Sequence, residues 1–535
     1  MLLASLLLLA NDPADPPSTY SGRAGKLDVQ VPRLEAAAEM DGKLDENAWK
    51  EAAVLTGFSQ FSPTDGLPAA DSTQVLVWYS PTAIHFGIRA FEAHGAVHAT
   101  LADRDRIAAD DHVQILLSTF NDGRQATVFA VNPYGVQSDG ALVETGATSG
   151  NGFNNAVVKR ETADLSPDFV FDSKGRLTEQ GYEVEVRIPF KSLRFQPKQE
   201  QSWGINIVRL VQHSGREDSW TPARRASASF LGQSGRLVGL NDLRRGVVLD
   251  FTPSLTSRTI GSQSAGGWEY QGGGPELGGT VRWGVTNNLT LNATANPDFS
   301  QVESDAQQFA FDPRQEIFFS EKRPFFLDGI EQFTTPNQLI YSRRIIQPVA
   351  AAKLTGKALG TDLAVLTAVD DRVGSRTGSD NPVYNLLRVQ RDVGSQSRLG
   401  LVYTDKVDGG DYNRVAGADA RLVFGGVYSA QMQLAGSRTR SLGTTTTAPL
   451  WSARFARNGR TFGLRYTMTG IDEDFRARSG FIQRAGIVHT NLNHRLTVYG
   501  KPKGLIESFT GDVGLDGTWE YRRFVNGQGI QDQKL

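Results

Sequence analysis

Apolar and polar residues alternate along much of the chain, in short runs that end at Gly, Pro or Asn. Clear examples lie at 84–90, 182–188 and 289–295, where every second residue is apolar. A period of two is the pattern of a β-strand with one buried face and one solvated face. Because the runs are short and turn residues separate them, the chain is predicted to be all-β, with antiparallel strands.

The N-terminal half, residues 32–243, is predicted to form a β-sandwich. Residues 41–49, DGKLDENAW, indicate a turn and then a short helix that Asp45 can cap, with Trp49 packed inward. The strands at 84–90, 182–188 and 205–207 follow it. Each alternates cleanly, which is typical of antiparallel sheets with one wet face.

The residues before this domain are predicted to be an export signal and a linker. Residues 1–10, MLLASLLLLA, indicate the apolar core of a partial secretory signal peptide, without the usual basic start. Residues 11–31 are rich in Asp, Pro, Ser and Gly, and are predicted to be a linker.

The alternation is strongest in residues 246–535, where it fits either an outer-membrane β-barrel or a soluble sandwich. The apolar positions of 289–295, 428–434 and 462–468 would face lipid in a barrel, and the polar positions between them the lumen. Long links are expected near 260–275, 297–346, 370–381, 406–411, 438–447 and 470–484, and short links near 286–288, 357–361, 394–396, 425–426, 458–460 and 500–504. Short periplasmic turns and long external loops are typical of outer-membrane barrels, so a barrel is favoured.

The order of the links also predicts an orientation. The first strand leads into a long link, so it runs outward and the N-terminal domain is predicted to be periplasmic. About thirteen strands are expected by Glu520, whereas bacterial single-chain barrels have even numbers. The sequence ends Gln533-Lys534-Leu535, without a terminal aromatic residue. The barrel is therefore predicted to be incomplete at its C-terminus.

The link at 297–346 is far longer than a hairpin needs. Its first part contains eight Phe residues and charges of both signs, so it is predicted to pack rather than to be disordered. One interpretation is a structured surface loop. The other is a plug inside the barrel, with some of the Phe residues clustered and the charges facing polar lumen residues; its plug or lumen residues would be Glu303, Asp305, Glu321, Lys322 and Arg323.

Several stretches carry a resemblance to a family. The segments PDFSQVESD at 297–305 and FFSEKRPFFLDG at 318–329 resemble the signature of uncharacterised bacterial outer-membrane proteins. In that family a domain like family 9 carbohydrate-binding modules precedes a β-barrel region of unknown function. DGKLDENAW resembles the opening of such modules, and 129–140, 183–195 and 203–209 also match, so the resemblance covers most of residues 35–350. It implies an outer-membrane location and a carbohydrate ligand.

Sugar recognition needs aromatic faces for apolar C–H patches and planar polar groups for hydroxyls. The candidate carbohydrate-binding residues are Trp78, Tyr134 and Trp220, with Asn132, Asp139 and Arg209 as polar partners. The alternative is that these aromatic residues belong to the core or its rim.

A run of aspartates at 103–111 offers oxygen ligands for calcium, with Asp110 and Asp111 as the candidates. Arg104 and Arg106 sit among these carboxylates, which favours a solvated, ion-paired loop instead. No other metal and no cofactor is expected.

Composition excludes several other classes of protein. The 535 residues have a net charge of −2, so they carry no electrostatic footprint for nucleic acid. The absence of Cys excludes disulfides, thiolate metal sites and a Cys nucleophile. Neither His-Glu-x-x-His nor Gly-x-Ser-x-Gly occurs, so no catalytic residue is nominated.

Three functions fit these observations. The leading hypothesis is an outer-membrane barrel, in contact with lipid, whose periplasmic carbohydrate-binding-like domain helps to bind or pass a glycan or another polymer. One alternative is an accessory to glycoside hydrolysis in polysaccharide catabolism. The other is a structural or secretion-partner protein without sugar binding, with envelope partners that the sequence does not identify.

Overall fold

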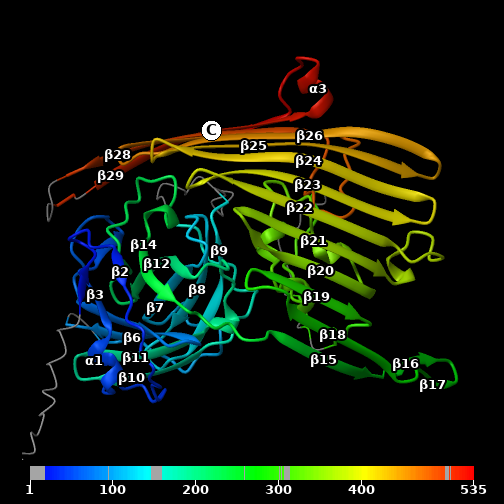
Figure 1. Cartoon of the computed structure of the whole chain (residues 1–535). Helices are drawn as coiled ribbons and strands as arrows, with labels where there is room; N and C mark the ends of the chain where they lie inside the picture. The colour runs from blue at the N-terminus through cyan, green and yellow to red at the C-terminus, as the bar shows by residue number, and fades with distance from the viewer. Residues whose placement is uncertain are drawn as a thin grey trace, which may run out of the picture.

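The computed structural model describes residues 18–93, 96–145, 160–257, 259–300, 302, 304–305, 314–500, 505–506 and 508–534. These residues form a two-sheet sandwich, drawn blue to green, and a long curved sheet, drawn green to red (Figure 1). The sandwich lies beside the concave face of the curved sheet. The predicted all-β class, with a sandwich followed by a large antiparallel sheet, is confirmed.

The sandwich consists of two sheets. Among the described residues, the first has six strands in the order β1 (Thr19–Ser21), β3 (Ala53–Thr56), β5 (Thr73–Tyr79), β6 (Ala83–Phe91), β11 (Gly181–Pro189) and β10 (Asp172–Thr178). The second has β2 (Asp28–Gln30), β14 (Gly235–Asn241), β12 (Glu200–Val211), β7 (His112–Ser118), β8 (Gln125–Val131) and β9 (Gln137–Val143), with β4 (Ser59–Ser62) and β13 (Arg216–Ser219) alongside. The apolar side chains that alternate along these strands meet between the sheets and form one buried core.

A second apolar layer covers the other face of the first sheet. Helix α1 (Asn47–Glu51) packs Trp49, which is 2% exposed, against Trp78 of β5, with ring centroids 5.9 Å apart. The inward position predicted for Trp49 is therefore confirmed. The predicted cap is wrong: Glu46, not Asp45, is the N-cap residue, and its side chain makes no capping hydrogen bond.

Part of the stretch predicted as a linker belongs to the sandwich. Strand β1 pairs in parallel with β3, and β2 pairs in parallel with β14. Alternation over three residues is too short to be recognised as a strand in the sequence, so these two edge strands were missed. The predicted signal peptide, residues 1–10, lies outside the described residues.

The curved sheet is antiparallel and contains, among the described residues, fourteen strands in chain order. They are β15 (Leu249–Thr256), β18 (Glu276–Gly284), β19 (Leu289–Ala295), β20 (Pro348–Ala358), β21 (Thr361–Asp370), β22 (Val383–Val393), β23 (Ser397–Asp408), β24 (Asp411–Phe424), β25 (Tyr428–Ser441), β26 (Thr444–Asn458), β27 (Phe462–Ile471), β28 (Ile487–Tyr499), β29 (Ser508–Glu520) and β30 (Asp532–Lys534). Strands β15 and β30 are its two edges, so the described residues form an open curved sheet rather than a closed barrel.

The two faces of this sheet differ as predicted. In β19 the polar residues Thr290, Asn292 and Thr294 point to the concave face and are buried. The opposite, outward face presents large apolar side chains that are 36–69% exposed, among them Leu249, Phe251, Val365, Leu387, Leu401, Leu422, Leu434, Phe455, Leu496 and Phe509. Exposure of such a wide apolar surface to water is unfavourable, so this face is expected to contact a membrane or another protein.

Three of the expected long links are structured differently. Residues 260–275 contain a separate hairpin, β16 (Thr259–Ser264) and β17 (Gly267–Gly272). At 406–411 and 438–447 the strands run on, and only two residues remain in each turn. Gly409, with φ 60°, and Gly443, with φ 82°, adopt the left-handed conformation that two-residue hairpins require.

The other α-helices of the described residues are α2 (Pro324–Leu327) and α3 (Tyr521–Val525), and short 3-10 helices lie at Phe190–Ser192, Leu231–Gln233, Ile330–Phe333, Ser342–Arg344 and Arg372–Gly374. Among the residues that the structure describes, no helix is long and apolar enough to cross a membrane.

Candidate functional site

Residues 314–347, named here the internal segment, lie on the concave face of the curved sheet. The Gln332 side chain accepts a hydrogen bond from Gly356 N in β20 at 2.8 Å. Farther along the segment, Asn337 donates from its backbone N and from Nδ2 to Gln433 Oε1 in β25, both at 2.8 Å. Because these wall residues are far apart in the sheet, the segment crosses the concave face.

Phenylalanines hold the start of the segment in place. Phe325, Phe326 and Phe333 are buried against inward-facing side chains of β20–β22, including Tyr384, and Phe299 packs beside them. Burial of such rings stabilises a contact by roughly 1.5–3 kcal/mol each. Phe309 and Phe311 lie outside the described residues.

The charges predicted to face the lumen wall pair within the internal segment or with residues 304–305 just before it. The Arg323 guanidinium donates to Glu321 Oε1 at 2.8 Å and Oε2 at 2.7 Å, and to Ile345 O at 2.6 Å. Lys322 Nζ donates to Ser304 O at 2.8 Å. Asp305 pairs with Arg343 through two hydrogen bonds of 2.6 and 2.8 Å.

For Glu321 and Arg323 the expectation of lumen partners is therefore wrong: a spacing of two residues lets a bidentate pair close locally. Glu303, the remaining candidate of this group, lies outside the described residues.

Asp328 joins the three parts of the protein and was not singled out in the sequence. It accepts hydrogen bonds from Arg194 of the sandwich at 2.6 Å, and from Arg282 and Asn292 of the curved sheet at 3.1 and 2.9 Å. Lys353 Nζ donates to the Asp328 carbonyl at 2.5 Å. The sequence signal was its place in FFLDG, immediately after a Phe pair, but its partners are distant in the chain.

A cavity of about 500 Å³ lies where these parts meet. Its lining includes Arg194 from the sandwich, Arg282 from the sheet, and Lys322, Asp328 and Glu331 from the internal segment. Side chains of both charges and of three separate elements therefore surround one space, which suits a polar ligand and makes its shape depend on how the parts dock.

Buried ion pairs fix the sandwich to the short-turn end of the sheet. Lys357 Nζ lies 2.5 Å from Asp122 Oδ2 and 2.9 Å from Asp392 Oδ2, and Arg124 Nη2 lies 2.5 Å from Asp392 Oδ1. Both cationic side chains are at most 5% exposed. Paired and desolvated charges of this kind define one docking geometry.

The structure corrects two of the predicted carbohydrate-binding residues. Trp78 and Trp220 are 0% exposed. Trp78 is stacked on His85, with centroids 3.8 Å apart, and Trp220 Nε1 donates to Tyr20 O at 3.3 Å. Neither ring offers an open face to a sugar, because Trp78 lies in the apolar layer beneath α1 and Trp220 lies in the core between the two sheets.

The polar partners are structural in the same way. Asn132 closes a turn by accepting from Tyr134 N and Val136 N at 3.0 and 2.9 Å. Asp139 pairs with Arg104, and burial raises the pKa of Asp139 to about 6. Arg209 donates to Glu92 Oε2 at 3.1 Å and is buried. Of the six residues, only Tyr134 is substantially exposed, at 36%.

The carboxylate oxygens of the two calcium candidates accept hydrogen bonds from protein groups. Asp110 accepts from Thr100 Oγ1 at 3.0 Å and Asn132 Nδ2 at 2.8 Å, and Asp111 accepts from Gln212 N at 2.7 Å. Within the described residues, no group of three or more His, Cys, Asp or Glu side chains is placed to hold a metal ion.

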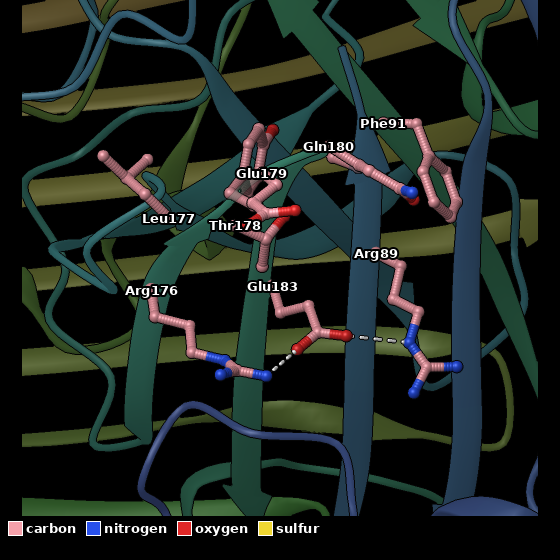
Figure 2. Close-up of a pocket in the computed structure, with 10 residues that line it drawn as sticks. Arg89, Phe91, Arg176, Leu177, Thr178, Glu179, Gln180 and Glu183 are labelled. Carbon is pink, nitrogen blue, oxygen red and sulfur yellow. Dashed lines mark hydrogen bonds and ion pairs between the residues drawn. The ribbon is translucent and has the colours of Figure 1, made fainter.

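A solvent-open hollow of about 690 Å³ lies on the outer face of the first sheet (Figure 2). Glu183 of β11 stands between two arginines, accepting from Arg89 Nε at 3.0 Å and from Arg176 Nη2 at 2.6 Å. Phe91 and Leu177 are apolar residues that also line the hollow. Planar donors and acceptors next to apolar surface are what sugar recognition requires, and the sequence showed these residues only as alternating strand positions.

Glu185, two residues after Glu183 along β11, makes the sandwich sensitive to pH. Burial raises the pKa of this carboxyl to about 7, although hydrogen bonds from Gly42 N at 2.7 Å and Trp49 Nε1 at 3.2 Å oppose the rise. Between about pH 4.5 and pH 7 the folded protein therefore binds more protons than the unfolded chain, and stability falls as pH increases. In Glu185→Gln this fall should become smaller, as measured by thermal unfolding from pH 5 to 8. An unchanged slope would contradict the assignment.

Comparison with known proteins gives one family match and several structural likenesses. Residues 247–361 match the model of a domain of unknown function, DUF5916. The predicted resemblance to a barrel region of unknown function is confirmed by this match. No curated protein sequence matches the chain significantly.

The structural likenesses cover either 39% of this chain or most of it. A family 9 carbohydrate-binding module from Caldicellulosiruptor kristjanssonii, in complex with cellotriose, is 14% identical, with coverage of 39% of this chain and 92% of the module, and a TM-score of 0.27. A putative carbohydrate-binding protein from Bacteroides uniformis is 15% identical, with coverage of 39% and 98% and a TM-score of 0.28. OccK7 (OpdD) of Pseudomonas aeruginosa is 8% identical, with coverage of 84% and 89% and a TM-score of 0.22.

Proposed function

We propose that this chain is an outer-membrane protein in which the curved sheet lies in the bilayer and the sandwich lies on the periplasmic side. The observation that carries the proposal is the contrast between the two faces of the sheet. Its outward face is apolar and exposed, whereas its concave face carries both polar and apolar side chains, and the internal segment covers the apolar ones. Contact with lipid accounts for the exposed apolar residues of the outward face, and contact with a filled interior accounts for the covered concave face.

Aromatic residues on the outward face support this placement. Near the end of the sheet that docks the sandwich they are Trp283, Phe424, Tyr428, Phe455, Phe462 and Tyr499, and near the opposite end they are Tyr412, Trp451 and Trp519. Tyr412 and Phe424 lie at opposite ends of β24, about 40 Å apart along the strand at about 3.3 Å per residue. With the usual tilt of about 40°, this corresponds to a band roughly 30 Å tall between two aromatic girdles.

The side on which the sandwich docks supports its periplasmic location. Lys357 and Asp392, its buried ion-pair partners, lie next to the short turns after β20 and β22. Short turns are periplasmic in outer-membrane barrels. The protein then binds or passes a glycan or another polymer, with the hollow of Figure 2 as the sugar-recognition surface.

Fractionation of cells that make the full-length chain tests the membrane part. The protein is expected in the outer-membrane fraction and should resist extraction by carbonate, because the apolar outward face holds it in lipid. Recovery in the soluble periplasm would contradict the proposal.

A glycan panel on the detergent-solubilised full chain tests the sugar part. Binding is expected to be weak, and Arg176→Ala should lower it by about tenfold because one arm of the Glu183 ion pair is lost. Arg187→Ala is the matched control, since Arg187 pairs with Asp172 on the same face but does not line the hollow. Equal losses in both variants would show that the hollow is not the binding surface.

A structural or secretion-partner role is the second candidate, and the burial of Trp78 and Trp220 favours it. In that case the sandwich serves to close the short-turn end of the sheet. No binding signal with any plant, algal or bacterial glycan would support this candidate over the first.

A further inference from the structure

A cavity of about 430 Å³ lies on the concave face at the end where the long links meet. We name it the mouth pocket. Three elements build it: the internal segment, the end of β23, and the link between β27 and β28, residues 472–486. Its charged lining consists of five cations and one carboxylate, namely Arg343, Arg344, Lys406, Arg476, Arg478 and Glu316.

The link 472–486 is folded onto the sheet, so its cations have fixed positions. Arg476 N donates to Ser437 Oγ at 3.2 Å, and Arg478 N donates to Asn413 Oδ1 at 2.7 Å. Phe475, 1% exposed, packs into an apolar cluster with Leu339 of the internal segment and wall residues of the sheet. Backbone atoms on both sides of the arginine pair are therefore anchored.

Among the described residues, the cations that line the mouth pocket outnumber the carboxylates. Arg344 pairs with Glu316 at 2.7 Å, and Arg343 is neutralised by Asp305. Among the described residues, the other three cations hydrogen-bond to neutral groups: Lys406 to Gly374 O at 3.4 Å, Arg476 to Glu473 O and Phe475 O, and Arg478 to Ser441 Oγ at 3.5 Å. Asp370 and Asp408 act on Lys406 at longer range, so the excess of positive charge is carried mainly by Arg476 and Arg478.

Uncompensated cations in a walled cavity concentrate positive potential and attract anions. Guanidinium groups bind carboxylate and sulfate oxygens with a planar fork of donors, which makes such contacts both strong and specific. The volume is within the range of about 300–1,000 Å³ found for ligand pockets. Ile346 and Ile482 add apolar surface beside the cations, which suits the C–H face of a sugar ring.

We infer that the mouth pocket binds an acidic sugar unit through its carboxylate or sulfate group, and so selects anionic glycans at the outer end of the sheet. The choice of a glycan rests on the proposed function, whereas the charge of the ligand rests on the pocket alone. Lys406, Arg476 and Arg478 provide the contacts to the anionic group.

The test uses the detergent-solubilised full chain and three fluorescent oligosaccharides of equal length: oligogalacturonate, dextran sulfate and uncharged dextran. At low salt, at least one of the two acidic probes should bind about tenfold more tightly than dextran, and added salt should weaken that binding. Arg476→Gln combined with Arg478→Gln should lower the affinity for the acidic probe by about tenfold. Lys406→Gln should lower it severalfold, and it leaves the backbone contacts of the arginines intact.

The matched control is Arg438→Gln combined with Arg440→Gln, which removes the same charge from exposed positions of β25 outside the pocket. It should leave the affinity within about twofold. Equal binding of dextran and both acidic probes, or an equal loss in the control variant, would overturn the inference. Failure of the proposed membrane location would appear in fractionation and would leave this measurement in detergent unchanged.

Discussion

Deletion of residues 301–333 is expected to raise the single-channel conductance of the full-length protein severalfold in planar bilayers. The reason is that this stretch contributes Phe325, Phe326, Asp328 and Gln332 to the surface that covers the concave face. Removing it uncovers Asn292 and other polar wall residues, which water and ions can then reach.

The control locks the segment instead of removing it. The chain contains no Cys, so Asn337→Cys with Gln433→Cys introduces the sole pair that a short thiol crosslinker can join. These two residues are already in hydrogen-bond contact, and the crosslinked protein should keep the low conductance of the native chain. If the deletion leaves conductance unchanged, and a protease outside intact cells cuts residues 301–333 readily, the stretch is an external loop.

Much of the fold was predictable because alternation over seven or more residues shows that a segment is a strand and also which of its side chains point to which face of the sheet. In β19, Thr290, Asn292 and Thr294 were assigned to the concave face from period alone, and they lie there. Link lengths were less predictable. The strands around Gly409 and Gly443 extend further than their apolar stretches, because polar residues can pair in a ladder beyond the apolar band.

The predicted sugar site shows that the alternation of residues along a strand does not reveal which other elements cover its outer face. Trp78 lies on the face of the first sheet opposite the main core, where a wet surface would be expected, but α1 and Trp49 cover that face. Trp78 is buried because a short helix, α1, packs on that face of the sheet, and such a tertiary contact cannot be read from the alternation of residues along a strand. The hollow at Arg89, Arg176 and Glu183 was missed for the same reason, since three strands must assemble before it exists.

The internal segment shows a similar division. Its packing was predictable from eight Phe residues in one link. Its polar contacts were not: Glu321 and Arg323 satisfy each other locally, whereas Asp328 bonds to Arg194, which is far away in the sequence. Local pairs can be read from spacing, but the residue that ties the three parts together cannot.

Lys357→Met is expected to release the sandwich from the curved sheet. The Lys357 ammonium sits among the carboxylates of Asp122, Asp392 and Asp362, at 2.5, 2.9 and 3.7 Å, and the side chain is 3% exposed. Its loss leaves three acidic groups around Arg124. Removing one partner of a buried ion pair costs about 3–5 kcal/mol, so the undocked population should increase by more than about 100-fold.

Trypsin can measure this opening. Arg245, between the sandwich and β15, is 6% exposed, and undocking should make the bond after it cleavable. Lys43→Met is the matched control, because Lys43 also pairs with an aspartate, Asp41 at 2.7 Å, but in an exposed position where ion pairs contribute about 0–1 kcal/mol. That variant should be cut at the native rate.

A second variant separates loss of charge balance from loss of packing. Asp122→Asn added to Lys357→Met removes one of the carboxylates left without its cation. If electrostatic imbalance drives undocking, the double variant should be cut more slowly than Lys357→Met alone, because coupled sites are not additive. Cleavage of Lys357→Met at the native rate would show instead that other contacts hold the two parts together. The bond from Ala228 N to Gly426 O at 2.9 Å and the pair of Arg194 with Asp328 would then be the next contacts to remove.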